Sequence, residues 1–156
     1  MRARQRIQGS AGFIICDARH LPIVVVRWFG TPELALVTAL AQWMDQLLDT
    51  LEREQLRAAM VLDISHSDPP DSDNRRAMVA ARTAKLPRLR ERLVADLLVV
   101  NRPAVRAVIT AMNWISPHVQ ATPATSLDEA LRRCHEALAR EGIIAPRLTA
   151  IEFEAP

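Results

Sequence analysis

Three apolar runs rich in β-branched and small residues constrain the fold of this chain more than any other feature. They span residues 23–29, 58–65 and 97–100, and each is nearly continuous in its apolar character. A continuous run of this length suits a strand that is covered on both faces, as in a parallel sheet. Segments with helical periodicity separate the runs. Strands that alternate with helices in this way predict an α/β fold with a mainly parallel sheet packed with helices.

The remaining elements complete a predicted order of β-β-α-β-α-β-α-β-α. A short strand at 13–16 precedes the first run, and the turn between them makes the two strands antiparallel neighbours. A weak last strand is expected at 119–122. Helices are expected at 31–55, from about 74, from about 103, and at 126–142.

One domain, residues 13–142, is expected for a chain of 156 residues. Residues 1–12 are polar and basic and are expected to form a flexible N-terminal arm. The C-terminal tail, residues 143–156, is rich in apolar side chains that need a cover, and residues 148–153 alternate like a strand. We therefore expect the tail either to dock on its own domain or to pair with another subunit, most simply in a two-fold homodimer.

Several residues predict how the helices begin, end and pack. Thr31 is the expected N-cap of the first helix, and Pro87 is expected to kink or split the second. Ser126 and Glu129 have capping-box spacing at the start of the last helix, and Gly142 is expected to end it. The stripe of the first helix that is expected to face the sheet contains Leu40, Met44, Leu47 and Leu51.

Trp43 lies beside the main apolar stripe of the first helix. Packing in the core is the first expectation for this side chain. Its position also allows a second interpretation, an exposed apolar patch for a partner or a second subunit.

Charge and cysteine usage exclude several classes of protein. The 20 basic and 18 acidic residues leave a net charge of +2, so neither a nucleic-acid partner nor a membrane partner is expected. No apolar run approaches the roughly 20 residues of a membrane span, and no secretory signal is expected. Cys16 and Cys134 lie far apart among apolar neighbours and predict buried thiols in a reducing compartment. These observations predict a cytoplasmic protein.

The second helix carries seven basic residues and one acidic residue. We interpret this excess as a solvated face that acidic helices elsewhere balance, because no aromatic residues are interleaved with it. Among binding partners for this face, an acidic protein patch is favoured over DNA or lipid, since arginine forks suit carboxylates. The basic residues are Arg75, Arg76, Arg82, Lys85, Arg88, Arg90 and Arg92.

No catalytic signature is present in the sequence, and no catalytic residue, metal or cofactor is expected. The single glycine at the first strand–helix turn, Gly30, excludes a dinucleotide-binding loop. An enzymatic alternative remains in the polar loop after the third strand, at the carboxyl end of the sheet. There His66, Asp68, Asp71 and Asp73 have the residue types for acid–base or metal chemistry, although a solvated loop is the simpler interpretation.

The same loop carries a resemblance to a known family. Residues 61–65 end a strand, and Asp71-Ser72 begins the next helix eight residues after Asp63. This arrangement resembles the STAS domains, the family of sulfate-transporter and anti-sigma-factor-antagonist domains. The resemblance implies that Ser72 is the phosphoacceptor. The alternative structural role is that Asp71 or Ser72 caps the helix.

Three further stretches agree with this resemblance, which covers about residues 13–140. Residues 28–31, 99–106 and 125–131 are similar to the family's strand–Gly–helix turn, its fourth strand with the following helix, and the start of its last helix. The chain departs from the antagonists after Asp71-Ser72, where residues 73–76 replace a glycine-rich stretch.

The resemblance implies a non-catalytic interaction module in bacterial signalling or regulation, phospho-switched at Ser72. Two alternatives stay open: a carrier whose apolar pocket holds a small or lipid-like ligand, and an enzyme that uses loop 66–73. A regulatory or kinase-like protein is the expected partner. The expected partner-binding residues are Asp68, Asp71, Ser72, Arg75 and Arg76.

Overall fold

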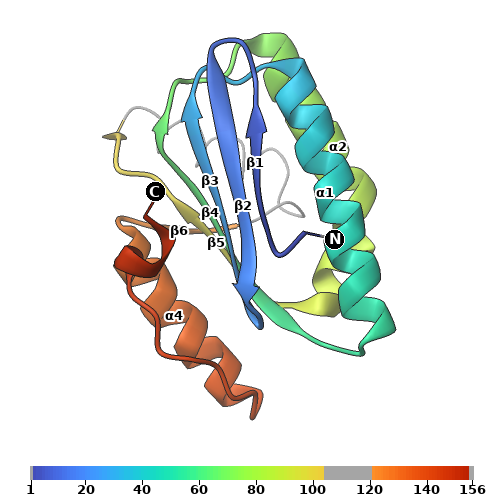
Figure 1. Ribbon diagram of the computed structural model, residues 1–156, viewed down its shortest axis with the longest axis vertical. Helices are drawn as coiled ribbons and strands as arrows, with labels where there is room; N and C mark the ends of the chain where they lie inside the picture. The colour runs from blue at the N-terminus through green and yellow to red at the C-terminus, as the bar shows by residue number, and fades with distance from the viewer. Residues whose placement is uncertain (1, 104–120, 155–156) are drawn as a thin grey trace.

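A computed structural model describes residues 2–103 and 121–154 and contains a six-stranded, mostly parallel sheet between helices (Figure 1). This architecture confirms the predicted α/β class. The strands are β1 (Arg4–Gln8), β2 (Gly12–His20), β3 (Ile23–Gly30), β4 (Ala58–Ser67), β5 (Leu93–Val99) and β6 (Thr122–Ala124). The helices are α1 (Leu34–Arg53), α2 (Ser72–Arg92), α4 (Leu127–Arg140) and the short 3₁₀ helix η1 (Ala150–Phe153).

The strands lie in the sheet in the order in which they occur along the chain. The pairs β1–β2 and β2–β3 are antiparallel, and β3 to β6 are parallel neighbours. Because parallel connections are right-handed and both β3–α1–β4 and β4–α2–β5 step in the same direction, α1 and α2 lie on one face. Figure 1 shows α4 on the opposite face. None of the helices in the described ranges is long and apolar enough to cross a membrane.

Residues 4–8 form the edge strand β1, so the expectation of a flexible arm at residues 1–12 is wrong there. This strand pairs with β2 through a tight turn in which the Gly9 amide donates to the Gly12 carbonyl at 2.8 Å. Ile7 packs against the core beneath α1. Its polar neighbours at alternate positions conceal the strand pattern, because a single inward apolar residue gives little periodic signal.

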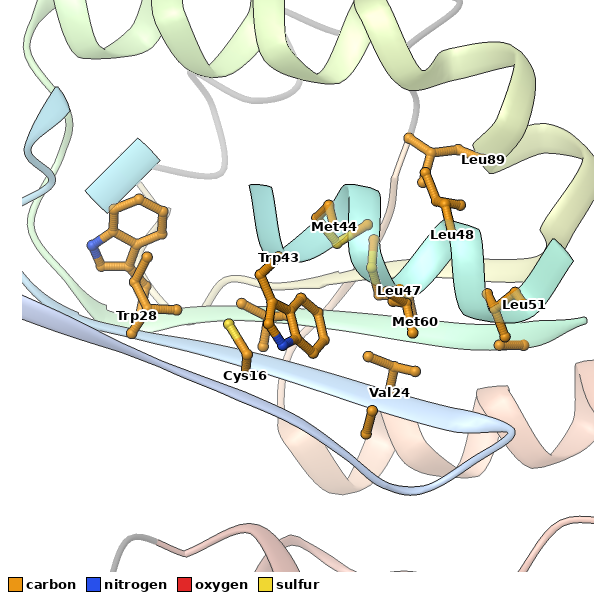
Figure 2. Close-up of a cluster of buried hydrophobic side chains, with 14 of the residues drawn as sticks. Cys16, Val24, Trp28, Trp43, Met44, Leu47, Leu48, Leu51, Met60 and Leu89 are labelled. Carbon is orange, nitrogen blue, oxygen red and sulfur yellow. The ribbon is translucent and has the colours of Figure 1, made fainter. Parts of the chain in front are cut away.

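The helix α1 packs one broad face on the sheet, and Figure 2 shows Trp43 pointing from it toward the strands that carry Cys16 and Val24. Trp43 is 2% exposed, which confirms core packing and excludes the exposed patch. It lies four residues before Leu47 on the same helical face. Met44, Leu47 and Leu51 are buried, as predicted, whereas Leu40 is only half-buried.

The opposite face of the sheet is covered by α4. Its buried side chains pack against alternate residues of β3, β4 and β5 that point away from α1, including Val25, Val61 and Leu97. The central strands are therefore covered on both sides, as their continuous apolar runs predict. The α4 residues in this layer are Leu127, Ala130, Leu131, Cys134 and Leu138.

The C-terminal tail folds back on its own domain beside α4. Phe153 is 1% exposed, whereas Ile144 is 95% and Ile151 is 73% exposed. The expected strand at 148–153 is wrong, because the segment contains η1. The Glu152 carboxylate accepts hydrogen bonds from the Thr149 amide and hydroxyl, and such local bonds compete with strand pairing.

Three arginines from three strands fasten the tail by its backbone. Arg19 of β2, Arg27 of β3 and Arg4 of β1 donate to the carbonyl oxygens of Glu152, Phe153 and Glu154 at 3.0–3.2 Å. Buried carboxylates pair with all three arginines: Arg4 and Arg19 pair with Asp17, and Arg27 pairs with Asp63. These contacts hold the tail as part of the domain and do not test the homodimer.

The helix ends agree with the sequence only in part. Ser126 caps α4 by accepting from the Glu129 amide, and Gly142 has the left-handed φ of 70° that ends the helix. The Glu129 side chain reaches Thr125 in place of Ser126. Thr31 does not cap α1, which begins at Leu34.

Pro87 is expected to kink or split the second helix, and the split is wrong, because α2 is continuous through Pro87. The missing amide deprives only the carbonyl of Thr83, four residues earlier, and both residues are exposed to water. The last strand lies at Thr122–Ala124, later than expected. The helix expected from about 103 falls almost entirely outside the described residues.

Leu47→Ala is expected to lower the free energy of unfolding by about 2–5 kcal/mol, because the truncation leaves a cavity under α1. Denaturant titration measures this change. Leu34→Ala, on the same helix but 61% exposed, is the matched control and should change stability by less than about 0.5 kcal/mol. Equal effects of the two substitutions would contradict the packing of α1.

Burial raises the pKa of both cysteine thiols to about 12. Because this value lies far above pH 8, the thiols stay protonated and enclosed in the folded protein. Ellman's reagent at pH 8 should therefore detect neither thiol in native buffer and both in guanidinium chloride. Rapid labelling of either cysteine in native buffer would show that its layer of the core is open.

Candidate functional site

The connection from β4 to α2 lies at the carboxyl end of the parallel strands, where α/β proteins place ligands. We refer to residues 68–76 as the docking segment. It is braced against the turn between β3 and α1. The Thr31 hydroxyl donates to Asp68 Oδ2 at 2.9 Å, the Asp68 amide donates to the Gly30 carbonyl, and Asn74 Nδ2 donates to the Pro32 carbonyl at 3.0 Å. These contacts give the segment a fixed position on the domain.

Asp71, and not Ser72, caps α2. Asp71 Oδ1 accepts from the amides of Asp73 and Asn74 at 3.0 and 2.8 Å, and Oδ2 accepts from Asn74 Nδ2. Ser72 is the first helical residue, and its exposed hydroxyl makes one long bond of 3.3 Å to Asp73 Oδ1. Because Asp71 provides the cap, the Ser72 hydroxyl is not needed for capping and is exposed on the surface.

The two arginines of the docking segment have different surroundings. Arg76 is exposed and pairs with Asp73 at 2.5 Å. Arg75 is half-buried, and its Nη2 donates to the Pro70 carbonyl at 3.3 Å. No carboxylate in the described part of the chain lies within ion-pair distance of Arg75. The five residues predicted from the sequence are thus brought together at one end of α2, and Arg75 is the cation among them with unused charge.

Much of the basic face of α2 is neutralised inside the molecule. Arg88 binds Glu52 and Asp49 of α1 at 2.6 Å, and Lys85 binds Asp45 at 2.5 Å. The hydrogen bond with Arg88 lowers the pKa of Glu52 and raises the pKa of Arg88. Acidic residues of a neighbouring helix therefore balance this face, as the sequence analysis expected.

Arg82 pairs with Asp96 of β5. Burial raises the pKa of Asp96 and Arg82 opposes that rise, while Asp96 Oδ1 is buried with no hydrogen-bond partner among the described residues. This pair ties the middle of α2 to the sheet.

The four residues that could serve an enzymatic site in loop 66–73 each make a separate structural contact. The His66 ring stacks on Phe29 at 5.3 Å, Asp68 accepts from Thr31, Asp71 caps α2 and Asp73 binds Arg76. Within residues 2–103 and 121–154, no group of three or more His, Cys, Asp or Glu side chains is placed to hold a metal ion. The geometry gives this loop structural roles and no assembled acid–base pair.

An apolar cavity of about 380 Å³ lies between α1, α2 and the sheet. The docking segment forms part of its wall through Asp68, Pro69, Pro70 and Arg75. The sequence analysis left a pocket open as an alternative but did not place it. Leu40 and Met78 line the cavity and are for that reason only half-buried. The cavity was not predictable from the sequence, because it depends on how α1 and α2 are spaced in the folded protein.

No protein-family model matches the chain, and no curated protein matches it significantly. The described residues form an α/β domain in which the braced segment 68–76 forms part of the wall of an apolar cavity.

Asp71→Ala is expected to destabilise the protein by about 0.5–2 kcal/mol, because the first amides of α2 lose their acceptor. Asp71→Asn, which keeps an acceptor oxygen, should restore most of the stability. Thermal or denaturant unfolding measures both variants. If alanine and asparagine give the wild-type value, the cap does not contribute to the stability of α2.

Proposed function

We propose that this chain is a non-catalytic, STAS-like interaction module of bacterial regulation that binds a partner protein through the docking segment. The observation that carries the proposal is the exposed Ser72 hydroxyl, which lies in the first turn of a helix that Asp71 already caps. A modifying enzyme can reach this hydroxyl without removing the cap. The bracing by Thr31 and Asn74 gives a partner a rigid surface.

The element order supports the STAS-like assignment. From β2 to α4 the order agrees with the one expected from the sequence pattern, apart from the helix expected from about 103, which lies outside the described ranges. Both crossover helices with described positions lie on the same face of the sheet, and the last helix lies on the other. The edge strand β1 is an addition to the expected order.

The charges around Ser72 provide a switch. A phosphate there carries about two negative charges at a helix N-terminus, where free amides and the helix dipole favour it. It would compete with Asp73 for Arg76 and attract Arg75, which pairs with no carboxylate among the described residues. Both arginines would then be withdrawn from an acidic partner.

The test has two stages. The full chain is used to capture a partner from the native organism, and the purified partner is then titrated against variants. Ser72→Asp is expected to weaken binding roughly tenfold, whereas Ser72→Ala binds like the wild type. Thr83→Asp is the matched control, because Thr83 is an exposed position on the same helix, about three turns from Ser72.

The outcomes separate the switch from the docking surface. If Ser72→Asp, Ser72→Ala and the wild type bind with equal affinity, the switch is wrong. If the double substitution Arg75→Glu and Arg76→Glu also leaves binding unchanged, the docking segment is not the interface.

A further inference from the structure

The cavity beneath the docking segment has the size and lining of a small-molecule site. Its volume of about 380 Å³ falls within the range of ligand pockets. The floor comes from three adjacent parallel strands and the walls from two helices. The apolar side chains that line it include Val26 and Met60 of the sheet, Leu40 and Met44 of α1, and Met78 and Val79 of α2.

The polar groups on the cavity wall are mainly cationic. Three basic side chains, Arg75, Arg82 and Lys85, face one acidic side chain, Asp68. Arg82 and Lys85 are already paired with carboxylates, and Asp68 accepts from the Thr31 hydroxyl. Arg75 lies beside the apolar lining and pairs with no carboxylate in residues 2–103 and 121–154.

The position of Arg75 defines the orientation of a ligand. Its guanidinium makes one hydrogen bond, at 3.3 Å to the Pro70 carbonyl, so most of its donors are unused by the described residues. A carboxylate or phosphate accepts such donors in a fork, and the partly buried setting strengthens the attraction. The rest of the cavity offers apolar contact and suits a hydrocarbon chain.

We propose that this cavity binds a single-chain amphiphile with an anionic headgroup, the head at Arg75 and the hydrocarbon chain between α1, α2 and the sheet. The site shares Asp68, Pro69, Pro70 and Arg75 with the docking segment. An occupied cavity engages Arg75, so the ligand and an acidic partner compete for it. The binding site itself does not depend on the proposed function.

Isothermal titration of the purified full chain tests the proposal with three probes: decanoate, decyl phosphate and 1-decanol, each below its critical micelle or solubility limit. The two anions are expected to bind about tenfold more tightly than the alcohol, the gain of one charge-assisted contact. Comparison of decanoate with decyl phosphate distinguishes a carboxylate head from a phosphate head.

Matched variants locate the head and the chain. Arg75→Gln should weaken binding of the anions about tenfold and leave the alcohol unchanged. Arg76→Gln is the control, because Arg76 is the neighbouring arginine but does not line the cavity. Val79→Phe should fill the cavity and weaken all three probes, with its circular dichroism spectrum and melting temperature showing that it folds.

Three results would overturn the proposal. The first is no binding of any probe to the wild type. The second is binding that a folded Val79→Phe variant leaves unchanged. The third is equal affinity for the alcohol and the anions, or equal losses in Arg75→Gln and Arg76→Gln. None of these results bears on the partner titration. The ligand-site proposal can therefore be wrong while the proposed function holds, and the reverse is also true.

Discussion

The rest of the structure depends on burying both faces of the central strands β3 and β4. Alternate side chains of β3 point to opposite layers: Val24 packs under α1, and Val25 packs against α4. Two layers of helices are therefore required, and right-handed crossovers assign α1 and α2 to one of them. The docking segment follows from this arrangement, because it is the short connection that lifts the chain from the end of β4 to the start of α2.

The contacts between α1 and α2 differ along their length, and the cavity is a consequence. In the C-terminal half of α2, Arg88 forms ion pairs with two carboxylates of α1. Leu89 is buried in the core cluster that contains Leu48 (Figure 2). Toward its N-terminal half, Met78 and Val79 are only half-buried and line open space. The cavity extends along α2 as far as Lys85 and Leu89, and the docking segment forms part of its wall at the other end. The same geometry thus joins the proposed partner surface to the proposed ligand site.

The sequence predicts what periodicity and capping chemistry determine. The continuous run at 23–29 indicated a strand buried on both faces, and the spacing of Leu47 and Leu51 placed α1 on the sheet. Features set by tertiary context were not predictable. Either Asp71 or Ser72 can cap a helix, so only the geometry separates the cap from the free hydroxyl. The cavity depends on how far apart α1 and α2 lie, which no local pattern encodes.

The arginines that hold the C-terminal tail recognise main-chain oxygens and not side chains. Arg4, Arg19 and Arg27 each donate to a carbonyl that every amino acid possesses. The identity of Glu152 or Glu154 therefore contributes nothing to these three bonds. Phe153 is the fully buried apolar anchor of the tail, and Ile143 and Leu148 are partly buried against the same core cluster. In relatives of this chain, the exposed side chains of the tail can therefore change while its backbone keeps the same position. Alignment of their C-termini would then look poor in a region whose backbone position is firmly determined.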